Sequence, residues 1–201
     1  MSHTPQSRLS IKPQAIILPR RWNRDEYHKM AECGIFGPEE RWELIDGVIY
    51  ETVGSIPRPY YAAIHRVREI LRKVYAGDYS VFSRSPLTLD EYCEPEADIV
   101  VAQGEYIEYS LRHPTAFDTC LVMEIYDGFV PRDRVIRAAM FAKANIAEYW
   151  ILDLVTRQLE VCRNPTPQSG YSTVITFAEE QSITPVSIER EISVASLLLP
   201  L

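Results

Sequence analysis

Cysteine and histidine are scarce in this chain, and neither is arranged as a structural site would require. The 201 residues contain four of each, and no two cysteines stand at the spacing of a zinc site. We therefore expect neither a disulfide framework nor a structural zinc. The sequence also lacks an apolar run near the ~20 residues that span a bilayer, and its start lacks an apolar segment followed by a cleavage site. These absences predict a protein of the reducing cytoplasm, with no membrane partner.

Positive charge is also in deficit, since the formal net charge is −7. This balance argues against a surface built mainly to grip nucleic-acid phosphates, although a local basic face can exist on an acidic protein. The hydrophobic content of 46% is enough for one compact core. We predict a flexible N-terminal lead over residues 1–20 and a single domain over residues 21–201.

Helical and strand patterns alternate along this domain. Helices are predicted over residues 23–36, where Asn23 can cap the first turn and Gly34 can end the last, and over residues 60–75 and 131–144. Strands are predicted at residues 48–52, 80–89, 98–102, 119–125, 148–154, 157–163 and 170–177. The order of these elements predicts an α/β fold, in which helices flank a mixed central sheet.

Three of these segments carry more specific expectations. The helix over 60–75 is the most basic in the chain, and a solvated face is favoured there over a phosphate-contacting one. In the helix over 131–144 we expect Pro131 in the first turn, with Val135, Ala139 and either Ala142 or Phe141 towards the core. The C-terminal stretch SVASLLLPL is interpreted as an edge strand, which favours a homodimer.

Acidic residues on two apolar runs are the strongest functional signal. Asp98 begins the run at 98–102, Glu124 lies near the end of 119–125, and Glu43 stands just before a predicted Asp46-Gly47 turn. Converging carboxylates can hold Mg²⁺, which lowers the pKa of a bound water and produces a nucleophile for phosphodiester attack. Such a site also needs a cation for the developing charge, and the candidates after Glu124 are Arg132, Arg134, Arg137 and Lys143.

Other interpretations of these acids stay open on spacing alone. Glu43 or Asp98 could be a cap or part of a surface ion pair, and Asp133 with Arg137 could form an ordinary ion pair along a helix. Two of the carboxylates could also serve a glycosidase, although nothing else in the sequence favours sugar hydrolysis.

Several blocks of the sequence resemble a known family in the same order and with similar spacing. They are RRWNRDEYHKMAECGIF with ERWELIDGVIYE, SPLTLDEYCEPEADIVV, and LVMEIYDGFVPRDRVIRAAMFAKANIAEYWILDL, all between residues 21 and 163. These blocks resemble the Uma-two family of bacterial endonuclease-like proteins, within the restriction-endonuclease-like PD-(D/E)xK superfamily.

The resemblance implies a restriction-endonuclease-like core and a magnesium-dependent site that hydrolyses DNA, with Mn²⁺ as a possible replacement. By residue-to-residue matching, Glu43, Asp98 and Glu124 are the catalytic acids. The metal ligands would be Asp98, Glu124 and the main-chain carbonyl of Ile125, while Glu43 would act directly or through water.

The chain departs from the family pattern beside these acids. Where the family carries a Lys four residues after an Asp, this chain has Arg137, and Tyr126 fills the slot of the other superfamily Lys. Arginine stays protonated and cannot act as a base, but it can bind a scissile phosphate. Tyr60 or Tyr61 stands where a His is common. Two hypotheses follow: a slower nuclease with Arg137 as its cation, or a non-cleaving DNA-binding or assembly module.

Overall fold

A mixed six-stranded sheet forms the centre of the molecule. The computed structural model describes residues 17–52, 57–128 and 133–200. The sheet contains β3 (Tyr79–Pro86), β4 (Glu96–Gln103), β5 (Thr119–Tyr126), β6 (Glu148–Asp153), β7 (Gln158–Thr166) and β8 (Gly170–Ala178), in that spatial order. Only the β5–β6 pair is parallel, and the other neighbours in the sheet are antiparallel. The predicted α/β class with a mixed central sheet is confirmed.

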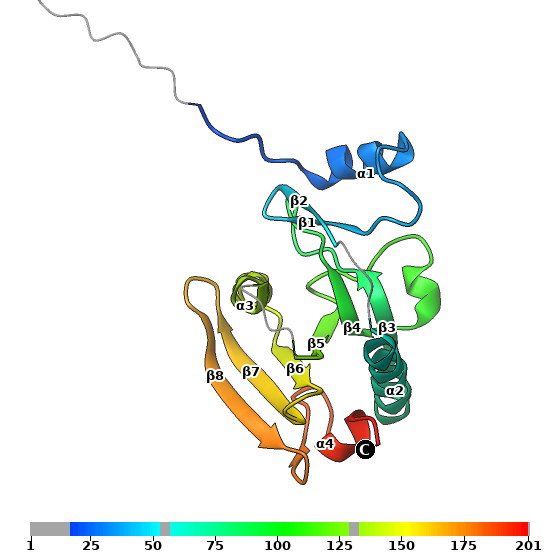
Figure 1. The fold of residues 1–201 in the computed structure, drawn as a ribbon, viewed down its shortest axis with the longest axis vertical. Helices are drawn as coiled ribbons and strands as arrows, with labels where there is room; N and C mark the ends of the chain where they lie inside the picture. Colours follow the sequence, from blue (N-terminus) through cyan, green and yellow to red (C-terminus); the bar gives the residue numbers. More distant parts are fainter. Residues whose placement is uncertain (1–16, 53–56, 129–132, 201) are drawn as a thin grey trace, which may run out of the picture.

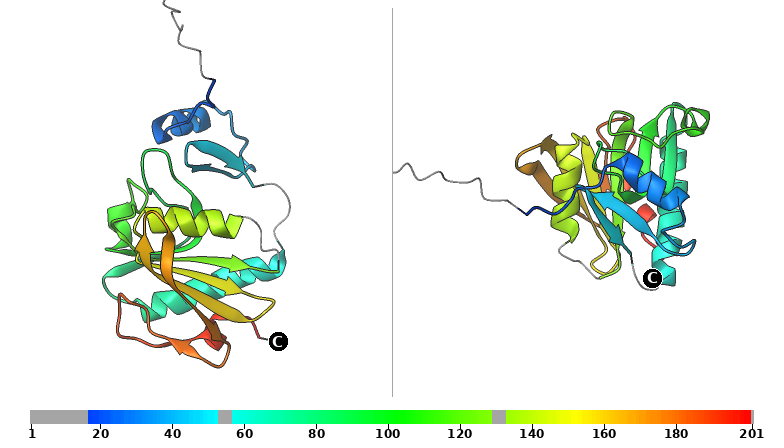
Figure 2. Two further views of the ribbon diagram at one scale, coloured as in Figure 1. Left: turned by 90° about the vertical axis from the view of Figure 1, so that its left-hand side faces the viewer. Right: turned by 90° about the horizontal axis from the view of Figure 1, so that it is seen from above.

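Helices cover both faces of this sheet (Figures 1 and 2). Helix α2 (Arg58–Val74) packs on one face together with α4 (Val194–Leu197), and α3 (Asp133–Lys143) lies on the other. The α2 side buries an apolar stripe at helical spacing, Ile64, Val67 and Leu71, against strand residues that include Ile99 of β4 and Met123 of β5. The α3 side buries a second cluster, which includes Phe141, Val100 and Val122. Because β5 is covered on both sides, it is apolar at nearly every position.

A smaller unit stands at one end of the sheet. Helix α1 (Arg24–Glu32) begins with a capping box between Asn23 and Glu26, and β1 (Trp42–Ile45) pairs with β2 (Val48–Glu51) through a tight turn. Asp46 and Gly47 have φ of 50° and 79°, as a two-residue hairpin turn requires. The hairpin joins the body through backbone hydrogen bonds between Leu44 and Glu94, while α1 and the hairpin lie over the end of β3 and β4 (Figure 1).

The remaining elements are short. They are the 3₁₀ helix η1 (Tyr106–Tyr109), followed by β9 (Ser182–Ile183) and β10 (Ile192–Ser193), which pair with each other. No helix in the described part of the chain is both long and apolar enough to span a membrane. All four cysteines are free thiols.

The predicted inner face of α3 is wrong at two positions. Val135 is 75% exposed and Ala139 is also exposed, whereas Phe141 and Ala142 are buried as expected. The buried face is instead centred on Arg137, which is only 4% exposed and lies one helical turn before Phe141. A prediction from apolar periodicity assigns arginine to the solvent side. The predicted inner face was therefore displaced around the helix from the face that is buried. Pro131 falls outside the described residues.

The predicted C-terminal edge strand is also wrong. Residues 192–193 form the short strand β10, and the following residues form α4, whose Val194 and Leu197 are buried beneath α2. The apolar side chains of this segment are used within the chain, so they give no support for a homodimer. The edges of the central sheet are β3 and β8.

Candidate active site

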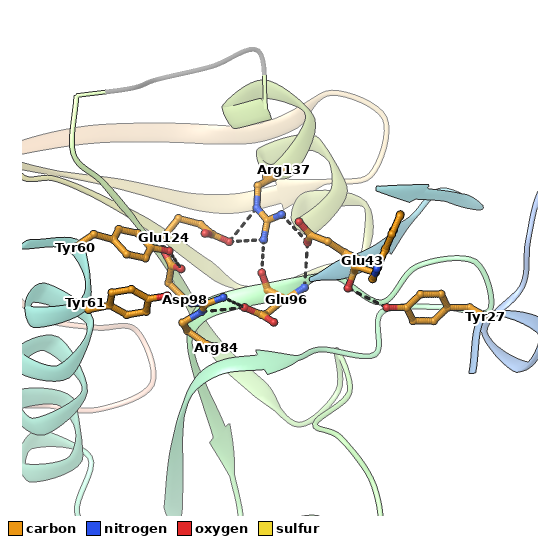
Figure 3. Close-up of polar contacts among 10 residues, drawn as sticks. Tyr27, Glu43, Tyr60, Tyr61, Arg84, Glu96, Asp98, Glu124 and Arg137 are labelled. Carbon is orange, nitrogen blue, oxygen red and sulfur yellow. Dashed lines mark hydrogen bonds and ion pairs between the residues drawn. The ribbon is translucent and has the colours of Figure 1, made fainter. Parts of the chain in front are cut away.

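The three predicted acids meet in one cavity at the end of the sheet. Glu43 comes from β1, Asp98 from β4 and Glu124 from β5, and all three line a cavity of about 320 Å³. Figure 3 shows Glu124 and Glu43 bonded to the guanidinium of Arg137, which comes from α3, and Asp98 beside Glu124 and Tyr60. The fourth predicted site residue thus belongs to the same cavity, so the fold brings together groups from four separate elements.

Asp98 stands where β4 and β5 separate. The last pair of their ladder is Ile99 with Met123, and beyond it the N–H of Ile125 donates to Asp98 Oδ2 at 2.8 Å instead of to a strand. The other oxygen, Oδ1, accepts a hydrogen bond from the hydroxyl of Tyr60 at the start of α2. Burial raises the pKa of Asp98, and these two hydrogen bonds oppose the rise.

Ile125 presents its carbonyl towards the same place. In an extended strand, the N–H and C=O of one residue point to the same side of the strand. The N–H of Ile125 points towards Asp98, on the β4 side of β5. The next residue, Tyr126, faces the β6 side, where its carbonyl accepts from the N–H of Leu154. The main-chain oxygen of Ile125 therefore faces the gap between β4 and β5, beside Asp98.

Glu124 is held by Arg137 within the protein interior. Its Oε1 accepts hydrogen bonds from Arg137 Nε at 3.0 Å and Nη2 at 2.7 Å. Burial raises the pKa of Glu124, and the charge of Arg137 opposes that rise. Burial likewise disfavours the charge on Arg137, but the charges of Glu124 and Glu43 outweigh it and raise the pKa of the arginine. The guanidinium therefore stays protonated.

The remaining bonds of Arg137 join the hairpin to the sheet. Its Nη1 donates to Glu43 Oε2 at 2.9 Å, and its Nη2 donates to the carbonyl of Glu96 at 2.7 Å. Glu43 Oε2 also accepts from the backbone N–H of Glu96 at 3.0 Å. Arg137 therefore connects β1, β4 and β5, and four of its five N–H groups donate to described residues.

A second arginine lies on the other side of Asp98. Arg84 on β3 donates through Nε and Nη2 to Glu96 Oε1, at 2.9 and 2.5 Å, and through Nη1 to the hydroxyl of Tyr61 at 3.2 Å. Its guanidinium carbon lies 5.6 Å from the centre of the Tyr61 ring, within the range of a cation–π contact. Figure 3 shows this group beside Asp98, apart from Arg137.

The cavity carries an excess of negative charge. Its lining contains five carboxyl side chains and three guanidinium groups, so its net charge is about −2 when all are ionised. In the described part of the chain, no three Asp, Glu, His or Cys side chains are close enough together to hold one metal ion. Asp98 and Glu124 nevertheless offer two buried hard oxygen donors beside a main-chain carbonyl, which suits an ion that keeps several waters. The residues thus fit a two-carboxylate magnesium site better than a three-acid one.

Sequence reasoning assigned no site role to three of these residues. Tyr60 was noted only as a position where a His is common, yet its hydroxyl donates to Asp98. Glu96 stands two residues before Asp98, and that proximity was the available signal. Arg84 gave no signal, because its place opposite Asp98 depends on strand register. On the basic helix α2, Arg72 and Lys73 are exposed, as expected of a solvated face, while Arg66 donates to the carbonyl of Ser196 on α4.

The architecture is that of a nuclease-like fold, with a mixed sheet covered by helices on both faces and acids at the end of its central strands. A crystal structure described as a putative nuclease belonging to DUF820, from Anabaena variabilis, has a similar fold with a TM-score of 0.66. The two chains are 17% identical, and the similarity covers 86% of this chain and 95% of the other, so it supports the fold alone. No curated protein matches this chain.

The model of the Uma2 family, described as a putative restriction endonuclease, matches residues 24–197. The chain belongs to this family, which confirms the resemblance found in the sequence.

Proposed function

We propose that this protein is a magnesium-dependent endonuclease that hydrolyses phosphodiester bonds in DNA. The observation that carries the proposal is the convergence of Glu43, Asp98 and Glu124 on one cavity in a member of the Uma2 family. Buried carboxylates destabilise a fold unless they are paired or bind a cation. The excess of negative charge here supports a cation as part of the working site. The four free thiols are in keeping with the reducing cytoplasm expected from the sequence.

Asp98, Glu124 and the carbonyl of Ile125 would hold Mg²⁺, or Mn²⁺ in its place. A bound ion of this kind supplies a water of lowered pKa and neutralises charge on the reacting phosphate. Tyr60 orients Asp98 by donating to one oxygen, and the Ile125 N–H fixes the other. Burial and the charge of Asp98 raise the pKa of Tyr60, so the phenol remains a donor throughout the physiological range.

Glu43 and Arg137 would complete the machinery without direct metal contact. The oxygen of Glu43 that accepts from Arg137 also accepts from the Glu96 N–H, which places this acid where it can act on the site through water. Arg137 donates four of its N–H groups to the surrounding acids and backbone. We propose that it holds Glu43 and Glu124 in place, rather than binding the scissile phosphate as the sequence suggested.

Plasmid nicking tests the proposal. Purified protein should convert supercoiled DNA to open circles with Mg²⁺ or Mn²⁺ and stop when EDTA is added, and Asp98→Asn should abolish the conversion. Asp118→Asn is the matched control, because this acid pairs with Arg112 outside the cavity and the variant should nick at the wild-type rate. Equal nicking by Asp98→Asn and wild type would show a contaminating nuclease and remove the proposal.

A second candidate function, a non-cleaving DNA-binding or assembly module, is favoured by one observation. The side chain at the family's Lys position is a buried arginine that already forms ion pairs with both Glu124 and Glu43. If the missing amine limits cleavage, Arg137→Lys should raise the nicking rate. An unchanged or lower rate in a folded Arg137→Lys variant would show that the amine is not the limiting group.

A further inference from the structure

We propose that Arg84, and not Arg137, is the residue that binds the phosphate of the nucleic-acid substrate. This inference rests on the proposed function, because it concerns how the same cavity receives DNA. The family pattern places the site's cation on α3, at the position of Arg137. The structure of this chain contains a second cation, from β3, that has the geometry and the free donors which phosphate binding requires.

Arg137 is poorly placed for an incoming anion. Its side chain is only 4% exposed and lies between two carboxylates, which would repel a phosphate on either side. Turning the guanidinium towards substrate would also break bonds to Glu124 in the interior, where loss of a partner leaves a costly unpaired charge.

Arg84 is held beside Asp98 by an unusual backbone conformation. The β3–β4 ladder pairs Ser83 with Ile99 and Ser85 with Ala97, which places Arg84 opposite Asp98. Arg84 has a φ of 49°, in the left-handed region that residues other than glycine rarely adopt. A local break of this kind within a strand redirects a side chain, and such strain is concentrated at functional sites.

The guanidinium of Arg84 keeps donors for a ligand. Three of its five N–H groups donate to Glu96 and Tyr61, which leaves one hydrogen on each terminal nitrogen. Two parallel N–H groups are the fork by which arginine binds phosphate oxygens. The side chain is 19% exposed and that of Glu96 is 31% exposed, so their ion pair lies where water can replace either partner.

Tyr61 supports the guanidinium of Arg84. The residue is 47% exposed, its hydroxyl accepts from Arg84 Nη1 and its ring lies within cation–π range, while Arg84 itself lines the cavity. Arg41 also lines the cavity and is the competing cation. The experiment must therefore separate these two arginines.

The salt dependence of DNA binding tests the assignment. Binding of a fluorescein-labelled DNA oligonucleotide would be measured by anisotropy across a salt series, in an Asp98→Asn background that cannot cleave. One lost phosphate contact lowers the slope of log affinity against log salt by about one. We expect Arg84→Gln to show that decrease, with affinity about tenfold weaker at low salt.

The chain offers a closely matched control. Arg157 also has a positive φ, of 53°, and pairs with Glu179 at similar exposure, 22% and 30% for the two side chains, but it lies outside the cavity. Arg157→Gln should lower the free energy of unfolding by about as much as Arg84→Gln does and leave the salt slope unchanged. Arg41→Gln should also leave the slope unchanged. Arg84→Lys keeps the charge and loses the fork, so it should keep the slope and weaken binding less than Arg84→Gln.

Each outcome decides the point. An unchanged slope in a folded Arg84→Gln variant, a decrease only in Arg41→Gln, or no DNA binding by the parent protein would overturn the assignment. If Arg84→Gln does not fold, a slope in Arg84→Lys that falls by about one would also overturn it, because a charge at that position should preserve the contact. Because binding is measured without cleavage, plasmid nicking can fail while the Arg84 result stands, and the reverse.

Discussion

Replacing Arg137 by methionine is the sharpest test of how the site is held together. Methionine keeps an unbranched side chain of similar reach and removes the guanidinium. Glu124 would remain buried, with its side chain only 9% exposed and without its cation. Breaking a buried ion pair from one side destabilises a protein by about 3–5 kcal/mol, a large part of the 5–15 kcal/mol typical of a whole domain.

The size of the stability loss depends on which partners of Arg137 can form replacement hydrogen bonds. Glu43 is 16% exposed at its side chain and retains the N–H of Glu96, so water and backbone replace part of its lost bond. Glu124 loses both bonds to its Oε1 and has little access to water. For a chain of this size, 3–5 kcal/mol corresponds to a decrease in Tm of roughly 6–20 °C.

Urea unfolding followed by circular dichroism would measure the change. Arg137→Met should lose about 3–5 kcal/mol, and Arg137→Met with Glu124→Gln should recover part of it, because a neutral amide is far less costly to bury. Arg134→Met is the control from the same helix: its pair with Glu160 is partly exposed, so the loss should stay below about 1 kcal/mol. An Arg137→Met variant within 1 kcal/mol of wild type, or a double variant less stable than the single, would refute this reasoning.

Three further results are expected. Burial would raise the pKa of Glu94, but its histidine and arginine partners on α1 outweigh burial and lower the pKa. The contribution of Glu94 to stability is therefore present above about pH 4.5 and is lost as the pH falls through the folded-state pKa. Glu94→Gln should accordingly flatten the acid limb of a Tm-against-pH curve. Gly47→Ala should lower the free energy of unfolding by more than Gly34→Ala, for which about 1 kcal/mol is expected. Both glycines have positive φ, but only the Cβ added at Gly47 meets other atoms, at 2.7 Å, and equal losses in urea unfolding would contradict this. Tyr60→Phe should weaken Mn²⁺ binding about tenfold by calorimetry, because Asp98 loses an orienting donor, and unchanged affinity would remove that role.

The sequence was sufficient for the features that depend on local chemistry. Asn23 with Glu26 fixes the start of α1, and Asp46 with Gly47 adopts the positive φ values of the predicted hairpin turn. Asp153 caps the turn after β6 by accepting from two backbone N–H groups, and an Asp at the end of a predicted strand is a local signal for such a turn. Each of these signals lies within a few residues, so no knowledge of tertiary packing was needed.

The acids and Arg137 were assigned to the site from the sequence, but the burial of Arg137 and the place of Arg84 were not, for a physical reason. Glu43, Asp98 and Glu124 stand at the ends or turns of strands, where a carboxylate beside apolar residues is conspicuous. Arg137 looks like a solvent-facing residue of an amphipathic helix, and only the depth of the acids beneath α3 makes burial favourable. Arg84 acquires its position from the register between β3 and β4, which a single sequence does not encode locally.

The position of Glu43 on the β1–β2 hairpin has a consequence for how the chain matures. In the part of the chain that the structure describes, this hairpin pairs with no strand of the six-stranded sheet, yet it supplies one wall of the cavity. It leaves the ribosome before the segments that carry Asp98, Glu124 and Arg137. A nascent chain therefore cannot assemble this cavity until α3 has been synthesised and has packed on the sheet, so the order of synthesis itself delays the formation of the proposed site.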